Sequence, residues 1–454
     1  MSPISRRHII GTGAAVAAGA ALTACGSGTP GESKNENGGG DKKTVQFWVT
    51  PFTSPENAWY KKIVEDFNKQ SKDVNVKLTV VPGDAWDQKL KAAQAAGKAP
   101  DLTVQPGRIT DNVLTGTMHE LDSLMDKKVW DDLEPLAEEV VTMGGKHYAY
   151  PLLLEPQNIL YWNKTMFEKA GLDPEKPPTT WDELFKACEK LKPTLRPDQF
   201  CVATSGDSGT FGWTTWSQQI HTAGHLPISD DWSKPAATDP KYLELGKFYN
   251  TLYKQGWMPK QPLGAGNSVA PFGQEKCAII SNGSWGMSEL AADFPKIADV
   301  TGMAPWVTND GDTSKYLATN GNMKWAIDAK SKVAKEAASF IQWAIADDPE
   351  RLIPFFVDTK FTKASARKSV KEKLDQQPGM KDAHWAKMIT ETVVPAAILE
   401  PNYPWDISLA MGTALEKCMR GQGSMEAAFK TADAEIAKVI KRENLPKKLK
   451  EING

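Results

Sequence analysis

Residues 44–81 read TVQFWVTPFTSPENAWYKKIVEDFNKQSKDVNVKLTVV and predict a strand, a helix and a second strand in turn. TVQFWVT alternates in polarity and is rich in β-branched and aromatic residues, which is typical of a buried strand. Ser54 and Pro55 suit the N-cap and the first helical position. Trp59, Ile63 and Phe67 then recur every four residues, so one helical face is apolar. VNVKLTVV supplies the second strand.

The alternation of strands and helices continues along the chain. DAWDQKLKAAQAAG predicts a helix that ends at Gly97, and DLTV predicts a third strand. Later, TTWDELFKACEKL carries a capping box, Thr180 with Glu183, and SKVAKEAASFIQWAIA predicts another amphipathic helix. Strands that alternate with helices predict an α/β fold with a parallel sheet.

Length and composition bound the function. At 454 residues the chain can form a large core and more than one domain. A net charge of -2 indicates no nucleic-acid partner. The 16 Trp outnumber the 9 Tyr, and tryptophans on loops would suggest surfaces on which a ligand stacks.

The N-terminus predicts an export signal in residues 1–25. Arg6 and Arg7 form a twin-arginine pair, and the apolar run after them is too short to span a membrane. LTAC before a glycine resembles a lipobox, which implies cleavage before Cys25 and a lipid on its sulfur; a plain secretory signal is the alternative. Residues 26–43 are rich in Gly, Ser and Asn and predict a flexible linker. We expect a lipid-anchored protein on the extracellular face of the cell membrane.

Four further cysteines follow Cys25, an even number for an oxidising compartment. Cys188 and Cys201 are close in sequence and are candidates for a disulfide, whereas a pair between Cys277 and Cys418 is left open. No CxxC spacing is present, so no metal cluster is expected.

Motifs for catalysis are weak. GDSG at 206–209 resembles a serine-protease segment. The glycine expected after it is replaced by Thr210, however, and the chain is α/β. His221 and His225 have zinc-compatible spacing without an HExxH glutamate. GAGNSVAPFG lacks the third glycine of a dinucleotide loop, and no Walker A sequence occurs. We therefore expect no enzyme activity, no cofactor and no metal.

Four segments in order carry a family resemblance: GKAPDL (97–102), residues 148–184 from YAYP to WDEL, AIISNGSWGM (278–287) and SKVAKEAASFIQWA (331–344). Together they resemble the family 1 extracellular solute-binding proteins of ABC importers. The resemblance implies two discontinuous α/β lobes joined by a hinge, with the ligand in the cleft. It places one lobe at 42–153 plus 318–363 and the other at 154–317 plus 364–454.

The resemblance also gives a role to SNGSWGMSEL, residues 281–290. It implies that Trp285 is a platform for a sugar ring, with Asn282 and Ser284 as polar partners; a core plug is the alternative. A sugar has an apolar C–H face that packs on an aromatic plane. Glu155, Gln157 and Asn158 are implied to face the cleft, or else to cap the hinge.

Further ligand contacts are expected from the same matching. Gln105 and Arg108 lie at the end of a strand, where open α/β sheets bind ligands. Maltose-binding members have an aromatic and an acidic residue there, so this chain departs from them. Trp213 and Trp216 form a second platform or belong to a helix core. The remaining candidates are Thr50, Phe52 and Thr53 after the first strand, Asn320 and Asn322 near the hinge, and Tyr403, Trp405 and Asp406, which either contact the ligand or pack a loop.

The resulting prediction is a monomeric, lipid-anchored substrate-binding component of an ABC importer. It captures a mono- or oligosaccharide by hinge closure and delivers it to a membrane permease. The alternatives are a secreted glycosidase and a binding protein for a peptide, a polyamine or a glycerophosphodiester.

Overall fold

The computed structural model describes residues 42–51, 53–82, 85–264 and 266–453. The predicted export signal, Cys25, nearly all of the linker and the candidate Phe52 lie outside the described residues. Within the described ranges, no helix is long and apolar enough to cross a membrane.

The first half of the chain builds most of a large sheet. Its strands are β1 (Lys43–Val49), β2 (Val74–Val80), β3 (Leu102–Pro106), β6 (Tyr150–Pro156), β11 (Thr319–Ile327), β12 (Ala364–Ser365) and β13 (Ile398–Leu399). The order is β12-β6-β11-β3-β1-β2, and β13 pairs with β11. β1 is parallel to β2 and β3, which confirms the predicted parallel pairing of the first three strands. β11 is antiparallel to both β3 and β6, which local patterns did not predict.

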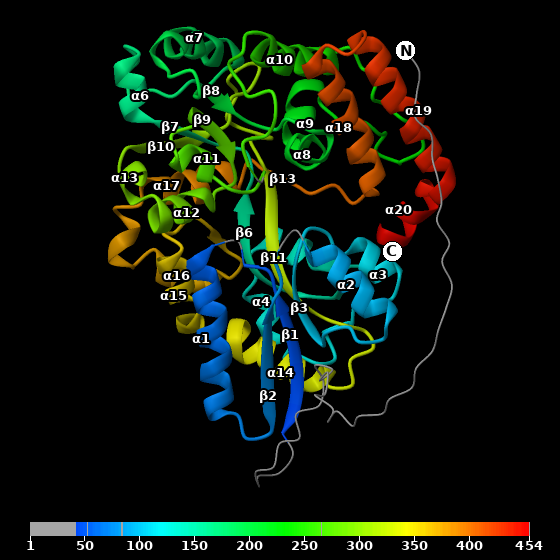
Figure 1. Ribbon diagram of the computed structural model, residues 1–454. Coiled ribbons are helices and arrows are strands. Elements are labelled where there is room, and N and C mark those ends of the chain that lie inside the picture. The colour runs from blue at the N-terminus through cyan, green and yellow to red at the C-terminus, as the bar shows by residue number, and fades with distance from the viewer. Residues whose placement is uncertain (1–41, 52, 83–84, 265, 454) are drawn as a thin grey trace, which may run out of the picture. The chain divides into compact units, whose positions relative to one another are not determined.

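A small sheet follows in the order β10-β7-β9-β8. Its strands are β7 (Ile159–Asn163), β8 (Phe200–Ala203), β9 (Cys277–Asn282) and β10 (Thr301–Pro305). β8 and β9 are parallel, and the other two pairings are antiparallel. A short hairpin pairs β4 (Thr142–Met143) with β5 (Lys146–His147). Figure 1 shows β6 and β11 running from the large sheet towards the elements of the small sheet.

Helices cover both sheets. Those before β6 are α1 (Ser54–Gln70), α2 (Trp86–Ala95), α3 (Thr110–Leu114), α4 (Lys128–Asp131) and α5 (Pro135–Glu139). Those between β7 and β11 are α6 (Lys164–Lys169), α7 (Trp181–Leu191), α8 (Ser208–Thr214), α9 (Trp216–Ala223), α10 (Tyr242–Lys254), α11 (Ala270–Gly273), α12 (Gly286–Asp293) and α13 (Pro295–Ala298). After β11 come α14 (Ala334–Ile341), α15 (Ile353–Asp358), α16 (Lys368–Leu374), α17 (His384–Lys387), α18 (Trp405–Arg420), α19 (Met425–Glu443) and α20 (Leu445–Asn453). In Figure 1, α1 and α2 lie on opposite sides of the large sheet.

Short 3-10 and π-helical segments complete the described elements: η2 (Lys192–Thr194), η3 (Gln342–Asp347), η4 (Pro349–Arg351), η5 (Pro378–Met380) and η6 (Met388–Val393).

The helix starts test the predicted caps. The Thr180–Glu183 capping box of α7 is confirmed, with both reciprocal bonds present. The N-cap of α1 is Thr53 and not Ser54, because the Thr53 side chain accepts from the Glu56 amide. The helix predicted at 331–346 is α14 followed by the π-helical η3.

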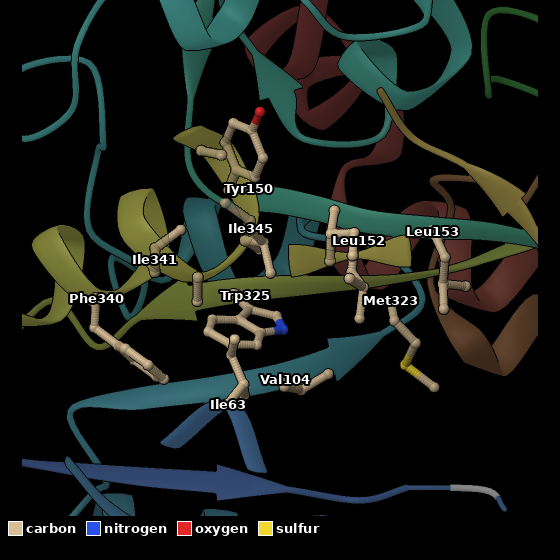
Figure 2. Packing of buried hydrophobic residues seen from close by; sticks show 14 of the residues in the cluster. Ile63, Val104, Tyr150, Leu152, Leu153, Met323, Trp325, Phe340, Ile341 and Ile345 are labelled. Carbon is tan, nitrogen blue, oxygen red and sulfur yellow. The ribbon is translucent and has the colours of Figure 1, made fainter. Parts of the chain in front are cut away.

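Each sheet has its own apolar core. Fully buried Trp325 of β11 is central to the core of the large sheet, where its ring lies 4.7 Å from Phe47 and 5.3 Å from Phe340. Figure 2 shows this indole among Val104, Ile63 and Phe340. The same core contains Val370 and Leu374, which the sequence prediction put in the second lobe. The lobe boundaries themselves stay a prediction.

Candidate functional site

A pocket lies at the carboxyl ends of the parallel strands β8 and β9, the position where open α/β sheets bind ligands. Its cavity volume is about 60 Å³, and it is open to solvent. Its polar and aromatic lining comes from the start of α8, the loop before α11, the end of β9 and the segment after β6, and includes Gln157, Asp207, Thr210, Trp213, Ser268 and Asn282.

Helix α8 shapes one side of this pocket. Asp207 caps α8 by accepting from the Thr210 amide at 2.9 Å, and Thr210 bonds back to the cap. Half-buried Trp213 lies one turn later and lines the pocket. The GDSG segment is therefore a helix start. Ser208 donates to Glu416, and His221 bonds to Asp310 at 2.8 Å, so these side chains form no catalytic pair.

Gln157 and Asn158 follow β6, where the chain passes from the large sheet to the small one. Gln157 lines the pocket, is 7% exposed, and its Oε1 has no hydrogen-bond partner among the described residues. A buried unpaired acceptor is costly unless a donor such as a ligand hydroxyl reaches it. Asn158 also lines the pocket, adopts a φ of 61° and donates to the Thr214 carbonyl at 2.6 Å; whether it contacts a ligand or caps the hinge stays a prediction.

Trp285 does not line this pocket. Its indole is 4% exposed and covers Gly283, where a Cβ would lie 1.9 Å from the ring. The indole N–H donates to the Asn267 carbonyl at 2.7 Å. The expected role as a sugar platform therefore stays a prediction.

Glu155 is part of a buried ionic triad. Lys363 Nζ lies 2.6 Å from Glu155 Oε2 and 2.9 Å from Glu56 Oε1, and no more than 6% of any of these side chains is exposed. Burial raises the pKa of Glu155, against the effect of Lys363. Burial lowers the pKa of Lys363, but the two carboxylates outweigh it and hold that pKa above its usual value. The Glu155 carboxylate thus has Lys363 as a partner, and its expected contact with a ligand stays a prediction.

Arg108 belongs to a second polar cluster, together with Lys324, Asn322 and Glu400. Its guanidinium donates to the Tyr403 carbonyl, and fully buried Lys324 donates to Asn322 and to the Gly107 carbonyl. Burial lowers the pKa of Arg108 and raises that of Glu400.

The other candidates have varied environments. Gln105 accepts from Asn112 at 3.0 Å and donates to Thr103 at 2.9 Å, so its amide is occupied. Trp216 is buried and donates to Ser408, which supports its place in a helix core. Trp405 is 40% exposed. The remaining candidates are buried Thr50, Thr53, Asn320 and Tyr403, and exposed Asp406, which pairs with Arg442.

The two disulfide candidates are not bonded to each other in the structure, and their pairing stays a prediction. Cys188 and Cys201 are both buried free thiols, as are Cys277 and Cys418. Cys201 Sγ lies 3.5 Å from the Cys188 carbonyl, so the thiol faces a backbone acceptor instead of forming the bond. Within the described residues, no three His, Cys, Asp or Glu side chains gather to hold a metal.

A profile for bacterial extracellular solute-binding proteins matches residues 53–350. The chain belongs to this family. Its members bind solutes and are not enzymes. The chain is 28% identical over 336 residues to a multiple sugar-binding protein of Streptococcus mutans, covering 71% of this chain and 74% of that protein. It is 25% identical over 420 residues to a mannitol-binding protein of Pseudomonas aeruginosa, covering 84% and 90%.

Solved structures show the same fold. An ABC transporter solute-binding protein from Thermotoga lettingae, bound with α-D-tagatose, superposes with a TM-score of 0.75 at 23% identity over 88% of this chain and 100% of that one. The sugar-binding protein MalE from Xanthomonas citri gives 0.66 at 20% identity, with 91% and 100% coverage. The two-lobed fold class expected from the resemblance is confirmed.

Proposed function

We propose that this solute-binding protein captures a mono- or oligosaccharide for an ABC importer. The observation that carries the proposal is the pocket at the ends of β8 and β9, where an aromatic face, Trp213, lies with the unpaired buried acceptor of Gln157. A sugar presents an apolar C–H face to the indole and O–H donors to the amide oxygen. Relatives named for binding several sugars and mannitol support this ligand class.

The charges around the pocket favour an uncharged ligand. Asp207 is the one charged side chain in its lining among the described residues, and that carboxylate already accepts from Thr210. No Lys or Arg of the described residues lines the pocket to pair with a phosphate. A glycosidase would need two carboxyl groups across the bond to be cleaved, and one occupied carboxylate does not supply them.

In this proposal, closure of the two lobes captures the ligand. The large and small sheets, with their cores, form two lobes, and the chain crosses between them at 157–158, 306–318 and 400–404. A ligand bound to both lobes stabilises the closed form. The closed protein then docks on a membrane permease. The chain is exported through the twin-arginine signal. A lipid on Cys25 then holds the monomer on the outer face of the membrane.

The test is a thermal-shift series on the body, residues 42–454. The probes are D-mannitol, D-tagatose, mannobiose and maltose, with sn-glycerol-3-phosphate, spermidine and a mixed tripeptide library as the other classes. A ligand at 100 times its Kd stabilises the folded state by about 2.7 kcal/mol, which raises the melting temperature. We expect one neutral sugar to give a saturable rise that is lost in Trp213→Ala and Gln157→Ala.

Trp343→Phe is the matched control, because this half-buried indole packs on Phe67 in the core of the large sheet. It should leave the sugar response unchanged. A rise in melting temperature with only spermidine, the tripeptides or sn-glycerol-3-phosphate would show that the ligand belongs to that class and not to the sugars. Release of new reducing ends from a disaccharide would overturn the binding role itself.

A further inference from the structure

Three side chains of SNGSWGMSEL hold the loop that walls the proposed pocket. Asn282 Nδ2 donates to the carbonyl oxygens of Ser268 at 3.1 Å and Gly266 at 3.4 Å. The Trp285 indole donates to the Asn267 carbonyl at 2.7 Å. Glu289 accepts from the Ser268 hydroxyl at 2.5 Å and from the Val269 amide at 3.0 Å. The contacts cover four consecutive residues, 266–269.

Residues 266–268 have little other support, whereas Val269 is fully buried in an apolar cluster. Gly266 and Asn267 are exposed and belong to no helix or strand. The carbonyl oxygens of 266–268 accept their bonds from the Asn282 and Trp285 side chains rather than from a sheet neighbour. Segments with few buried contacts open at low free-energy cost, so side-chain bonds decide how rigid they are.

The holding side chains are themselves fixed. Asn282 ends β9, and Glu289 lies on α12. The hydroxyl of fully buried Tyr161, on the neighbouring strand β7, donates to the carbonyl oxygens of Gly283 at 2.6 Å and Ser284 at 3.1 Å. A site supported from rigid elements keeps its geometry.

The loop lies against the aromatic side of the pocket. A Cβ added to Gly266 would meet Thr210 Cγ2 at 2.8 Å and the Trp213 ring at 3.7 Å. Gly266 is therefore in close contact with the α8 residues that line the pocket. A shift of this loop changes the space beside the Trp213 ring.

We propose that Asn282, Trp285 and Glu289 are positioning residues that clamp residues 266–269 against Thr210 and Trp213 and so set the size of the pocket. The inference rests on the proposed function, since it concerns the same pocket. Both functional groups of the Asn282 amide are used, because its Oδ1 also accepts from the Gly283 amide at 2.9 Å. The indole N–H of Trp285 is likewise used on the loop, and Trp213 supplies the aromatic face for the ligand.

The first test needs no ligand. Trp285→Phe keeps a ring and removes the N–H donor, and Glu289→Gln replaces one carboxylate acceptor by an amide donor. Hydrogen exchange at the Ser268 and Val269 amides is expected to quicken at least tenfold in both variants of the 42–454 body. Asp293→Asn, on the exposed end of the same helix, is the control and should exchange like the wild type. Unchanged exchange in both clamp variants would overturn the clamp.

The second test uses D-mannitol, D-tagatose and mannobiose with tryptophan fluorescence. Trp285→Phe is expected to raise Kd about tenfold while the sugar-dependent fluorescence change persists, and Trp213→Phe is expected to abolish that change. The opposite pattern, with the change lost only in Trp285→Phe, would make Trp285 the platform and overturn the assignment. If none of these sugars binds the wild type, the proposed ligand class fails, and the exchange measurement still decides whether the clamp exists.

Discussion

Among single residues, Lys363 has a large expected effect on stability. Its ammonium bridges Glu56 and Glu155 with none of its side chain exposed. Lys363→Met leaves two carboxylates buried without their cation, and removing one partner of a buried ion network costs about 3–5 kcal/mol. Urea unfolding of the body at pH 8 measures this loss.

The stability lost in Lys363→Met should be smaller at low pH. Burial already raises the pKa of Glu155, so the folded state favours its protonated form, and removal of Lys363 raises that pKa further. Lowering the pH from 8 to 5 therefore favours protonation of Glu155 and recovers part of the stability of the variant. Lys332→Met, at an exposed position, should show neither effect. An equal deficit at both pH values would contradict the ionic account.

Lys324 predicts a second pH dependence of stability. It comes from burial of the ammonium rather than from loss of an ion pair. Burial lowers its pKa to about 8 from the ordinary 10.5, although Glu400 opposes the shift. The folded state thus disfavours the ammonium. The penalty, on the order of 3 kcal/mol, is complete below pH 8 and disappears as the pH rises towards 10.5. Wild type should gain stability relative to Lys324→Met between pH 7 and pH 10 in urea unfolding. A constant difference over that range would show that the lysine is not desolvated.

Sequence reasoning recovered residue roles unevenly. Gln157 and Trp213 were predicted as ligand contacts, and the fold brings them to one pocket. Glu155 was predicted beside them, but Lys363, more than two hundred residues later, occupies its carboxylate. No local pattern reveals a partner so distant along the chain. The clamp on residues 266–269 was missed for another reason: most of its bonds are to backbone groups of the loop, which leave no residue-type signal.

At the scale of elements, the local signals were the dependable ones. The apolar period of α1 and the capping box of α7 act over a few residues and are present in the structure. The antiparallel insertion of β11 between β3 and β6 depends on pairing between segments far apart in the chain. The β11 residues are buried throughout and show no alternation.

The start of α7 gives a prediction at this scale. The Thr180 hydroxyl accepts from the Glu183 amide at 3.2 Å, and Glu183 accepts in return from the Thr179 and Thr180 amides at 2.8 and 3.3 Å. Thr180→Ala should lower the free energy of unfolding by about 1 kcal/mol, because a helix amide loses its acceptor. Lys190→Ala, exposed in the last turn, is the control in the same urea titration. A Thr180→Ala variant as stable as wild type would mean that the cap contributes nothing.

At the scale of the molecule, polar contacts join the two sheets away from the proposed pocket. The Thr110 hydroxyl, just after β3, lies 2.8 Å from Asn402 Oδ1, and Lys448 of α20 lies 2.8 Å from Asp111 Oδ1. Arg108 adds its bond to the Tyr403 carbonyl, and Tyr403 is part of the core of the small sheet. Such contacts favour the arrangement in which they form over any arrangement in which the sheets have moved apart.

Their removal should therefore shift the molecule towards an open form. Thr110→Val with Lys448→Met deletes one hydrogen bond and one ion pair between the two parts, besides the pair of Lys448 with Glu443. The two contacts between the parts are worth about 0.5–1 kcal/mol net each, so the ratio of closed to open forms should fall roughly 5- to 30-fold. Small-angle scattering of the 42–454 body would register this as a larger radius of gyration without sugar. Thr115→Val removes only hydrogen bonds within residues 111–117 and should leave the radius unchanged. If the double variant keeps the wild-type radius, these contacts lie at a pivot that both forms share, and closure depends on the ligand alone.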